Sequence, residues 1–238
     1  MKQNNKSNNQ KKRNDIPLNQ EAIAFQIRES YKAARTNIVY SIIKRGCKKI
    51  AFTSSDKSEG KTITSTNIAI ALAQQKNTRV LLIDCDLRRP QVHNVLSINA
   101  APGITNYLNG ECLKSDIIRT TNVENLQAVT YGAIPPNPSE LLASPEMKEF
   151  IKSVEPDYDY IIFDTPPVGV VIDAIPIINK SDGVVLIAKH NQTTYPALKK
   201  SVDILNRNGG KILGIIVNGT DSIRNKKYGK SYSYGYYA

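Results

Sequence analysis

The chain has 238 residues, of which 40% are apolar and 22% are charged, as in folded proteins that face water. This length suits one α/β domain of ordinary size with a full hydrophobic core. No apolar run reaches the roughly 20 residues that a membrane-spanning helix needs, and the polar, basic start excludes a secretory signal. These features predict a cytoplasmic protein.

The formal net charge of +11 is concentrated towards the two ends of the chain. Residues 1–14 carry five cations and no acid, and residues 221–238 carry four cations against Asp221. Such a balance suits nucleic acid, anionic lipid or an acidic substrate, and equally a solubilising tail. No nucleic-acid-binding motif is present, so we expect no nucleic acid as a partner. The three cysteines are too far apart for a metal knuckle or a redox pair, and their odd number fits a reducing compartment.

The expected elements begin after a basic segment, residues 1–16, which is predicted to be disordered. Residues 21–45 have helical apolar spacing, at Ile23, Ile27, Tyr31, Ala34, Ile38 and Ile42, and predict a long amphipathic helix. Apolar runs then alternate with helical stretches. The expected strands are 49–53, 80–84, 125–130, 159–164, 183–188 and 212–217. The expected helices between them are 61–75, 139–154, 172–179 and 195–208.

The expected strands are mostly apolar throughout, which indicates burial on both faces of a sheet. With helices between them, they predict an α/β fold: a doubly wound, mostly parallel sheet with helices on both faces. We place this folded domain at residues 17–220. Residues 221–238 are expected to form a flexible, tyrosine-rich tail.

A phosphate-binding loop is predicted where the first strand meets the following helix. It has Walker A spacing, except that Ser55 replaces the first glycine. In such a loop, backbone N–H groups and a helix N-terminus face an anion, and Gly60 allows the backbone to approach it closely. Lys61 is expected to reach the β- and γ-phosphates, and the Thr62 hydroxyl is a suitable ligand for Mg²⁺. The alternative is an ordinary glycine-containing turn. The predicted nucleotide-binding residues are Ser55, Asp56, Lys57, Ser58, Glu59, Gly60, Lys61 and Thr62.

Three aspartates end two of the expected strands. Asp84 and Asp86 follow the run Val80–Ile83, and Asp164 follows Tyr160–Phe163. Because ligands of open α/β sheets bind at the carboxyl ends of strands, all three acids are expected beside the phosphate loop. An aspartate there could hold Mg²⁺, or could accept a proton from an attacking hydroxyl. The alternative for any single aspartate in such a place is a helix N-cap, which is common.

Three longer motifs carry a family resemblance. Residues 82–90 read LIDCDLRRP, residues 135–142 read PPNPSELL, and residues 161–167 read IIFDTPP. With the Walker A loop, they resemble the cytosolic kinase domain of bacterial tyrosine kinases of the capsule and exopolysaccharide type, which are P-loop NTPases. The resemblance covers residues 20–238. In that family the loop, a Walker A′ motif and a Walker B motif form the ATP site.

The resemblance implies a role for each site residue. Lys61 and the loop amides would hold the phosphates of ATP, and Thr62, Asp86 and Asp164 would position Mg²⁺. Asp84 would be the base toward the tyrosine hydroxyl, whose ordinary pKa is near 10. Asn218, after the last strand, is expected to contact adenine, although an Asn in that place is more often only a turn residue. The expected catalytic residues are Lys61, Asp84, Asp86 and Asp164.

The ends of the chain fit the same resemblance. Family members are autophosphorylated in trans on a C-terminal tyrosine cluster, so the expected phosphoacceptors are Tyr228, Tyr232, Tyr234, Tyr236 and Tyr237. The family pattern Glu-x-x-Arg-x-x-Arg contributes to ring assembly and corresponds to Glu29, Lys32 and Arg35. Lys32 keeps the charge but loses the bidentate fork of arginine. A solvated charged helix face and a tail without function are the alternatives.

The resemblance also implies partners. The chain has no transmembrane segment before its kinase domain, so a separate membrane protein, a polysaccharide co-polymerase, is expected to activate it. That activator would recruit the protein to the inner face of the cell membrane. A cognate tyrosine phosphatase is expected as well.

Two other functions remain open. Partition-type or division-site ATPases of the deviant Walker group share the loop, but carry a second lysine where this chain has Asp56. The second alternative is a non-catalytic, nucleotide-dependent scaffold whose tail another kinase modifies. The complete set of Lys61, Thr62 and the three aspartates favours the kinase.

Overall fold

A computed structural model describes residues 20–220, with side chains from residue 24 onward. The expected segments 1–16 and 221–238 lie outside these residues. The strands are β1 (Lys48–Ser54), β2 (Val80–Asp84), β3 (Ile118–Thr120), β4 (Leu126–Val129), β5 (Tyr160–Asp164), β6 (Gly183–Lys189) and β7 (Ile212–Asn218). They form one sheet in the order β3-β4-β2-β5-β1-β6-β7, in which only the β3–β4 pair is antiparallel.

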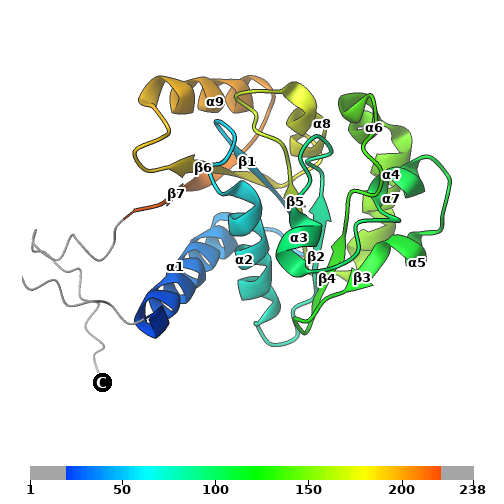
Figure 1. Ribbon diagram of the computed structural model, residues 1–238, viewed down its shortest axis with the longest axis horizontal. Helices are drawn as coiled ribbons and strands as arrows, with labels where there is room; N and C mark the ends of the chain where they lie inside the picture. Colours follow the sequence, from blue (N-terminus) through cyan, green and yellow to red (C-terminus); the bar gives the residue numbers. More distant parts are fainter. Residues whose placement is uncertain (1–19, 221–238) are drawn as a thin grey trace, which may run out of the picture.

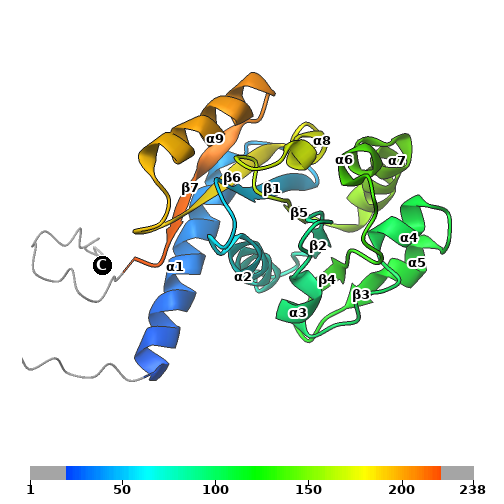
Figure 2. The same cartoon turned by 45° about the horizontal axis from the view of Figure 1, so that its top comes forward.

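Helices cover both faces of the sheet (Figure 1). They are α1 (Gln20–Ser41), α2 (Lys61–Ala73), α3 (Val92–Leu96), α4 (Ile104–Leu108), α5 (Lys114–Ile117), α6 (Pro138–Ala143), α7 (Pro145–Val154), α8 (Ile175–Ile178) and α9 (Tyr195–Arg207), with 3₁₀ turns η1 (Glu155–Asp157) and η2 (Ile172–Ala174). Figure 2 shows α1, α2 and α3 on one side and α6, α7, α8 and α9 on the other. The predicted doubly wound α/β fold is therefore confirmed.

The core consists of two apolar layers, one on each face of the sheet. Alternate residues of one strand enter different layers: Val80 and Leu82 pack under α1 and α2, whereas Leu81 and Ile83 pack under α7 and its neighbours. Every residue of β2 and β5 is buried. This burial on both faces explains why the central strands are apolar throughout.

The predicted helix over residues 139–154 is two helices. Ser144 adopts an extended backbone (φ −59°, ψ 156°), and its hydroxyl accepts a hydrogen bond from the Met147 amide at the start of α7. The ring of Pro145 disfavours helical geometry for the residue before it, so the chain must turn at this point. The predicted helix over 172–179 likewise resolves into a 3₁₀ turn and the short helix α8.

The first helix extends beyond the sheet, so its apolar stripe is buried only in its second half. Ile38 and Ile42 are buried, but Ile27 remains 50% exposed and Phe25 58% exposed. Figure 2 shows the N-terminal turns of α1 projecting past the sheet edge. Helical spacing predicts an apolar stripe along the helix, but it cannot show how far the rest of the domain extends to cover that stripe. Among the described residues, no helix is long and apolar enough to cross a membrane.

We expect the stability of the apolar layer that contains Leu81 and Ile83 to depend on α7. Phe150 is fully buried there, with its ring centroid 5.2 Å from that of Tyr107. Substituting Phe150→Ala should lower the free energy of unfolding by about 3–5 kcal/mol, because it removes a large side chain and leaves a cavity. The matched control is Ile134→Ala, at a side chain that is 64% exposed, which should change it by less than about 0.5 kcal/mol. Urea denaturation of both variants measures the difference. Equal effects of the two substitutions would show that Phe150 does not contribute to the core in this way.

Candidate active site

The predicted phosphate loop joins the end of β1 to the start of α2. Gly60 stands immediately before α2 with a left-handed backbone (φ 86°). A side chain at this position would also meet the Asn218 amide, only 2.7 Å from where its Cβ would lie. The left-handed backbone favours glycine here, and a side chain would also displace the Asn218 amide. The loop thus ends at a helix N-terminus, whose backbone N–H groups attract anions.

The ammonium group of Lys61 lies between two aspartates. Its Nζ is 2.9 Å from Asp164 Oδ1 and 3.3 Å from Asp86 Oδ2. The Thr62 hydroxyl donates to the other oxygen of Asp164 at 2.6 Å, and the Ser65 hydroxyl donates to Oδ1 at 3.2 Å. Lys61, Asp86 and Asp164 are all buried. The structure thus brings together the four side chains that were predicted for phosphate and magnesium.

Asp84 lies behind this cluster, with its carboxylate directed at the backbone. It is fully buried, and its Oδ2 accepts the N–H groups of Gln91 (3.1 Å) and Val92 (3.0 Å), while Oδ1 accepts that of Asp86 (3.2 Å). In the sheet, Asp84 is aligned with Asp164 of the neighbouring strand β5. These bonds hold the segment from 84 to 92 in one shape, which places Asp86 next to Lys61.

Burial perturbs the proton equilibria of the cluster. Burial, followed by repulsion from Asp164, raises the pKa of Asp84 to about 8. Burial also raises the pKa of Asp164, against the opposing attraction of Lys61. For Lys61, burial alone would lower the pKa, but attraction by Asp164 and Asp86 outweighs it, so the Lys61 pKa is raised. Asp84 and Asp164 therefore bind protons more readily than ordinary aspartates do, because their burial disfavours the charged form.

The donor set fits a small divalent cation. Mg²⁺ is usually held by one or two carboxylates together with phosphate oxygens and water. Here Asp86, Asp164 and the Thr62 hydroxyl already surround one cation, the ammonium of Lys61. Between residues 24 and 220, no three His, Cys, Asp or Glu side chains gather to hold a metal unaided. Two carboxylates and a hydroxyl match the small number of protein ligands that Mg²⁺ uses beside phosphates and water.

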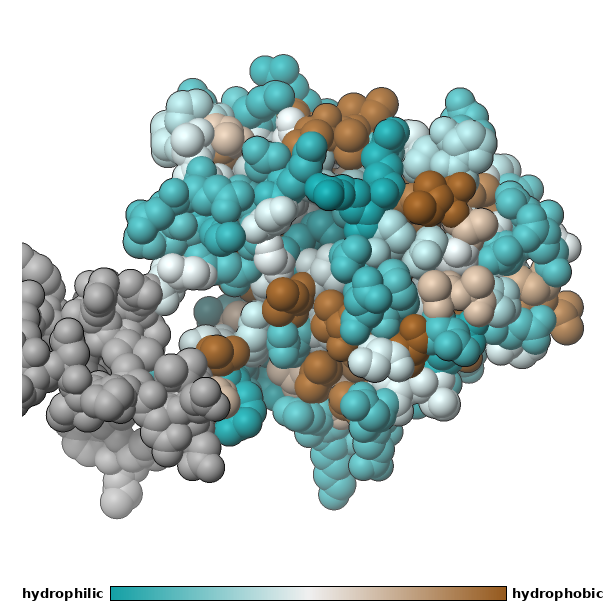
Figure 3. All heavy atoms as spheres, viewed as in Figure 1, coloured by the Kyte–Doolittle hydropathy of each residue, from teal (hydrophilic) through white to brown (hydrophobic). Residues whose placement is uncertain are grey.

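A cavity of ≈ 570 Å³ opens in front of the loop. Its walls include the loop itself, the segment after β5, and the cations Arg88 and Arg89. The exposed part of its lining includes three apolar side chains beside these arginines: Ile63, Val95 and Val170 are 56%, 41% and 47% exposed. Figure 3 shows hydrophobic residues, in brown, in several separate groups on the face seen in Figure 1. The cavity has the phosphate loop at its inner end, and both apolar and basic side chains among its exposed lining.

Asp173 is a residue that the motifs did not single out. It is buried, and both its oxygens accept hydrogen bonds from the guanidinium of Arg88. This pair joins the loop after β2 to the turn η2, and so fixes one wall of the cavity. The sequence does show an acidic residue nine positions after Asp164. Spacing alone, however, could not identify Arg88 as its partner.

Asn218 lies at the phosphate loop, as a residue for nucleotide binding must. Its side-chain nitrogen donates to the Glu59 carbonyl and to the Thr64 hydroxyl, both at 2.9 Å. The amide group therefore supports the loop from behind. The predicted contact with adenine stays a prediction.

The three residues predicted for subunit contacts lie on α1 in two different environments. Lys32 and Glu29 form an exposed ion pair at 2.7 Å on the projecting half of the helix. Arg35 instead points inward, and its Nη1 donates to the carbonyl oxygen of Ala71 near the end of α2, at 2.9 Å. Their role in assembly stays a prediction, and the predicted tail tyrosines lie outside the described residues.

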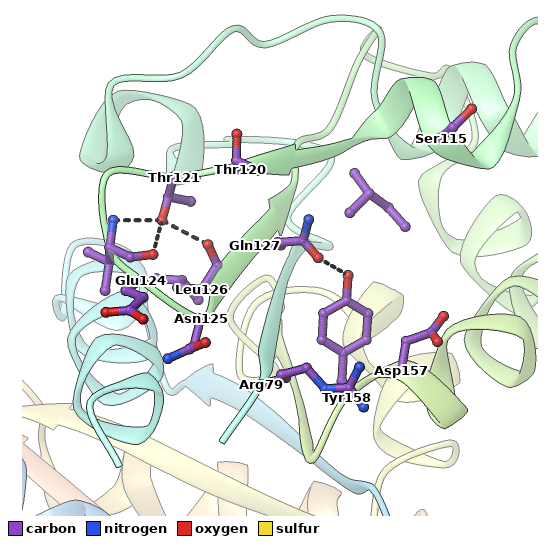
Figure 4. Close-up of a pocket in the computed structure, with 12 residues that line it drawn as sticks. Arg79, Ser115, Thr120, Thr121, Glu124, Asn125, Leu126, Gln127, Asp157 and Tyr158 are labelled. Carbon is purple, nitrogen blue, oxygen red and sulfur yellow. Dashed lines mark hydrogen bonds between the residues drawn. The ribbon is translucent and has the colours of Figure 1, made fainter. Parts of the chain in front are cut away.

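A second cavity, of ≈ 670 Å³, lies at the opposite edge of the sheet. Arg79, Asn125 and Tyr158 line it just before the amino ends of β2, β4 and β5. Figure 4 shows the Tyr158 hydroxyl donating to Gln127 within it. Since ligands of open α/β sheets bind at the carboxyl ends of strands, the cavity beside the phosphate loop is the candidate active site.

Comparison with known proteins identifies the family. Residues 47–207 match the profile of a family described as an AAA domain. Over 209 residues the chain is 39% identical to Tyrosine-protein kinase YwqD of Bacillus subtilis (strain 168), a match that covers 88% of this chain and 85% of that protein. The chain belongs to the bacterial tyrosine-protein kinases. The family resemblance of its motifs is thereby confirmed.

The solved structures of this kinase family agree with the fold. The kinase domain of the Escherichia coli tyrosine kinase ETK superposes with a TM-score of 0.78 at 31% identity, covering 88% of this chain and 80% of that one. The septum site-determining protein MinD of Pyrococcus horikoshii OT3, from the rival ATPase group, reaches 0.60 at 25% identity, covering 72% and 70%. The sheet and the loop are thus shared with that group, and the kinases are the nearer relatives of the two.

The buried acids predict a pH dependence of stability. Asp84 has a folded pKa of about 8 against an ordinary value of 3.8, so the folded state binds more protons than the unfolded state between these values. Its contribution to the free energy of unfolding should therefore fall as the pH rises from about 4 to about 8. Urea denaturation of the metal-free, nucleotide-free protein measures this slope, and Asp84→Asn should make it less negative.

The control for this slope is Asp157→Asn, at an exposed position. It should leave the pH dependence of the parent unchanged. A slope that is the same in all three proteins would show that Asp84 binds no additional proton in the folded state.

Proposed function

We propose that this protein is an ATP-dependent protein-tyrosine kinase that phosphorylates the tyrosine cluster of a second copy of itself. The observation that carries the proposal is the convergence of Lys61, Thr62, Asp86 and Asp164 at the N-terminus of α2. These are the groups that phosphoryl transfer needs, because its catalysis consists mainly of positioning and charge stabilisation. Membership of the kinase family supports the same chemistry.

ATP would bind with its phosphates along the loop 55–62. On binding, Lys61 would exchange its carboxylate partners for the β- and γ-phosphates, and the backbone N–H groups at the start of α2 would hold the remaining oxygens. Thr62, Asp86 and Asp164 would hold Mg²⁺, which neutralises charge on the phosphates when bound. The exposed apolar side chains of the cavity lining, with Ile63 and Val95, suit an aromatic ring.

The transfer step joins the tyrosine oxygen to the γ-phosphorus. That bond forms as the bond from the γ-phosphorus to the β,γ-bridging oxygen breaks, and ADP leaves with the electron pair. The phenolic proton passes to one carboxylate of the Walker A′ motif, which must be ionised to accept it. Asp84 is proposed as this base, and Asp86 is the aspartate of the motif that borders the cavity.

The proposed acceptors are Tyr228, Tyr232, Tyr234, Tyr236 and Tyr237 of a neighbouring subunit. Transfer between copies needs assembly, for which Glu29, Lys32 and Arg35 of α1 are proposed as contacts. The exposed Phe25 and Ile27 on the same helix are consistent with a surface that a second copy covers.

We further propose a cytoplasmic enzyme recruited to the inner face of the membrane by a separate transmembrane activator, the polysaccharide co-polymerase. The reaction would regulate capsule or exopolysaccharide synthesis, and a cognate tyrosine phosphatase would reverse it. These partners rest on membership of the kinase family.

Phosphotyrosine labelling tests the proposal. The purified full chain is incubated with Mg-ATP, with and without the cytosolic tail of the activator, and probed for phosphotyrosine. Lys61→Met should reduce labelling about a hundredfold or more, because the developing charge on the phosphates loses its ammonium partner. Lys76→Met, which changes an exposed lysine just beyond α2, should label like the parent.

A mixing experiment separates transfer between copies from transfer within one. A wild-type chain truncated before Tyr228 supplies the active site, and the full-length Lys61→Met chain supplies the tail. Label should appear on the Lys61→Met chain, at the five tail tyrosines. ATP hydrolysis without any phosphotyrosine would instead support a partition-type ATPase, and nucleotide binding without hydrolysis or label would support a scaffold.

A further inference from the structure

The side chain of Glu59 turns back into the phosphate loop of which it is part. It is only 1% exposed. Its Oε2 accepts the backbone N–H groups of Ser55, at 2.8 Å, and Asp56, at 3.0 Å. One carboxylate oxygen thus closes the loop on itself, joining its fifth residue to its first two.

The other carboxylate oxygen reaches a different part of the fold. Oε1 accepts a hydrogen bond from the hydroxyl of Thr193, in the segment between β6 and α9. That hydroxyl oxygen already accepts the N–H of Lys189 at 2.7 Å, so its own proton is free to point at Glu59. Within the described part of the chain Glu59 makes no ion pair, and neutral donors alone stabilise its charge.

The same segment also supports the outer side of the loop. The carbonyl oxygens of three consecutive loop residues accept hydrogen bonds from this segment, from the last residue of β6 and from the last residue of β7. The contacts are Gln192 Nε2 to Lys57 O (3.3 Å), Lys189 Nζ to Ser58 O (3.4 Å) and Asn218 Nδ2 to Glu59 O (2.9 Å). The carbonyls are therefore held from outside, and the first two amides are held from inside by Glu59.

Burying a carboxylate without a cation is unfavourable, so this arrangement needs a compensating benefit. The loop is strained: Ser58 has a left-handed backbone (φ 59°), which is disfavoured for residues with a side chain. The two bonds to the Ser55 and Asp56 amides stabilise the turn that contains this strain. They also consume only amides at the beginning of the loop, and leave those at the start of α2 directed at the cavity.

We propose that Glu59 is a positioning residue, which holds the nucleotide loop in its binding shape before ATP arrives, and that Thr193 is its anchor. The segment between β6 and α9 thereby helps to set the affinity for nucleotide. The inference rests on the proposed function only in that a nucleotide binds at residues 55–62. It does not depend on transfer to tyrosine.

The charge of Glu59 is not what the loop requires, because a negative charge beside a triphosphate is repulsive. A glutamine can make the same contacts: its oxygen accepts both amides, and its nitrogen donates to the Thr193 oxygen. Glu59→Gln should therefore preserve the loop, and Glu59→Ala should not. Thr193→Ser keeps the hydroxyl donor, and Thr193→Val removes it.

Calorimetric titration of the full chain with Mg-ADP and with a non-hydrolysable Mg-ATP analogue tests these four variants. We expect the Kd of Glu59→Ala to rise about tenfold or more and that of Thr193→Val to rise about threefold to tenfold. Glu59→Gln and Thr193→Ser should stay within about threefold of the parent. The control is Glu149→Ala, an exposed glutamate on α7.

Thermal unfolding without nucleotide separates positioning from general support of the fold. If Glu59→Ala lowers the melting temperature but binds nucleotide as tightly as the parent, the side chain only stabilises the fold and the proposal fails. It fails equally if Glu59→Gln binds as weakly as Glu59→Ala, since the shape of the loop would then not be the cause. If the parent protein binds no nucleotide, both this proposal and the proposed kinase function fail. If the parent binds nucleotide but never labels tyrosine, only the kinase function fails.

Discussion

The site depends on the attraction between one buried ammonium and two buried carboxylates. Without Lys61, Asp86 and Asp164 would face each other with Asp84 close behind, in surroundings where like charges repel strongly. The lysine therefore acts as the cation of the nucleotide-free site.

The order of the strands makes this cluster possible. Strand β5 lies between β1 and β2, so the Walker B aspartate is a neighbour of both the phosphate loop and the Walker A′ segment. The register aligns Asp84 with Asp164 across β2 and β5, and Asp164 with Phe52 across β5 and β1. Burial on both faces explains why β2 and β5 are apolar up to the aspartates at their carboxyl ends.

Much of this could be predicted from local sequence. The apolar central strands, the loop at Gly60 and Lys61, and the acids at strand ends follow from rules that act over a few residues. The break at Ser144 was not predicted, because helical spacing continues across it. Strand β3 was not predicted either, because three residues are too few to form a pattern. The bond from Glu59 to Thr193 spans 134 residues and depends on a side-chain direction, which no motif encodes.

The inward position of Arg35 links two ends of one helix. Its guanidinium donates to the carbonyl of Ala71 near the end of α2. Helix α2 begins at Lys61, ten residues earlier, which is about 15 Å along the helix axis. A contact that drew Arg35 outward would leave that carbonyl without its side-chain partner and remove one of the contacts between α1 and α2. Helix α2 thus connects its contact with α1 to the residues of the predicted phosphate site.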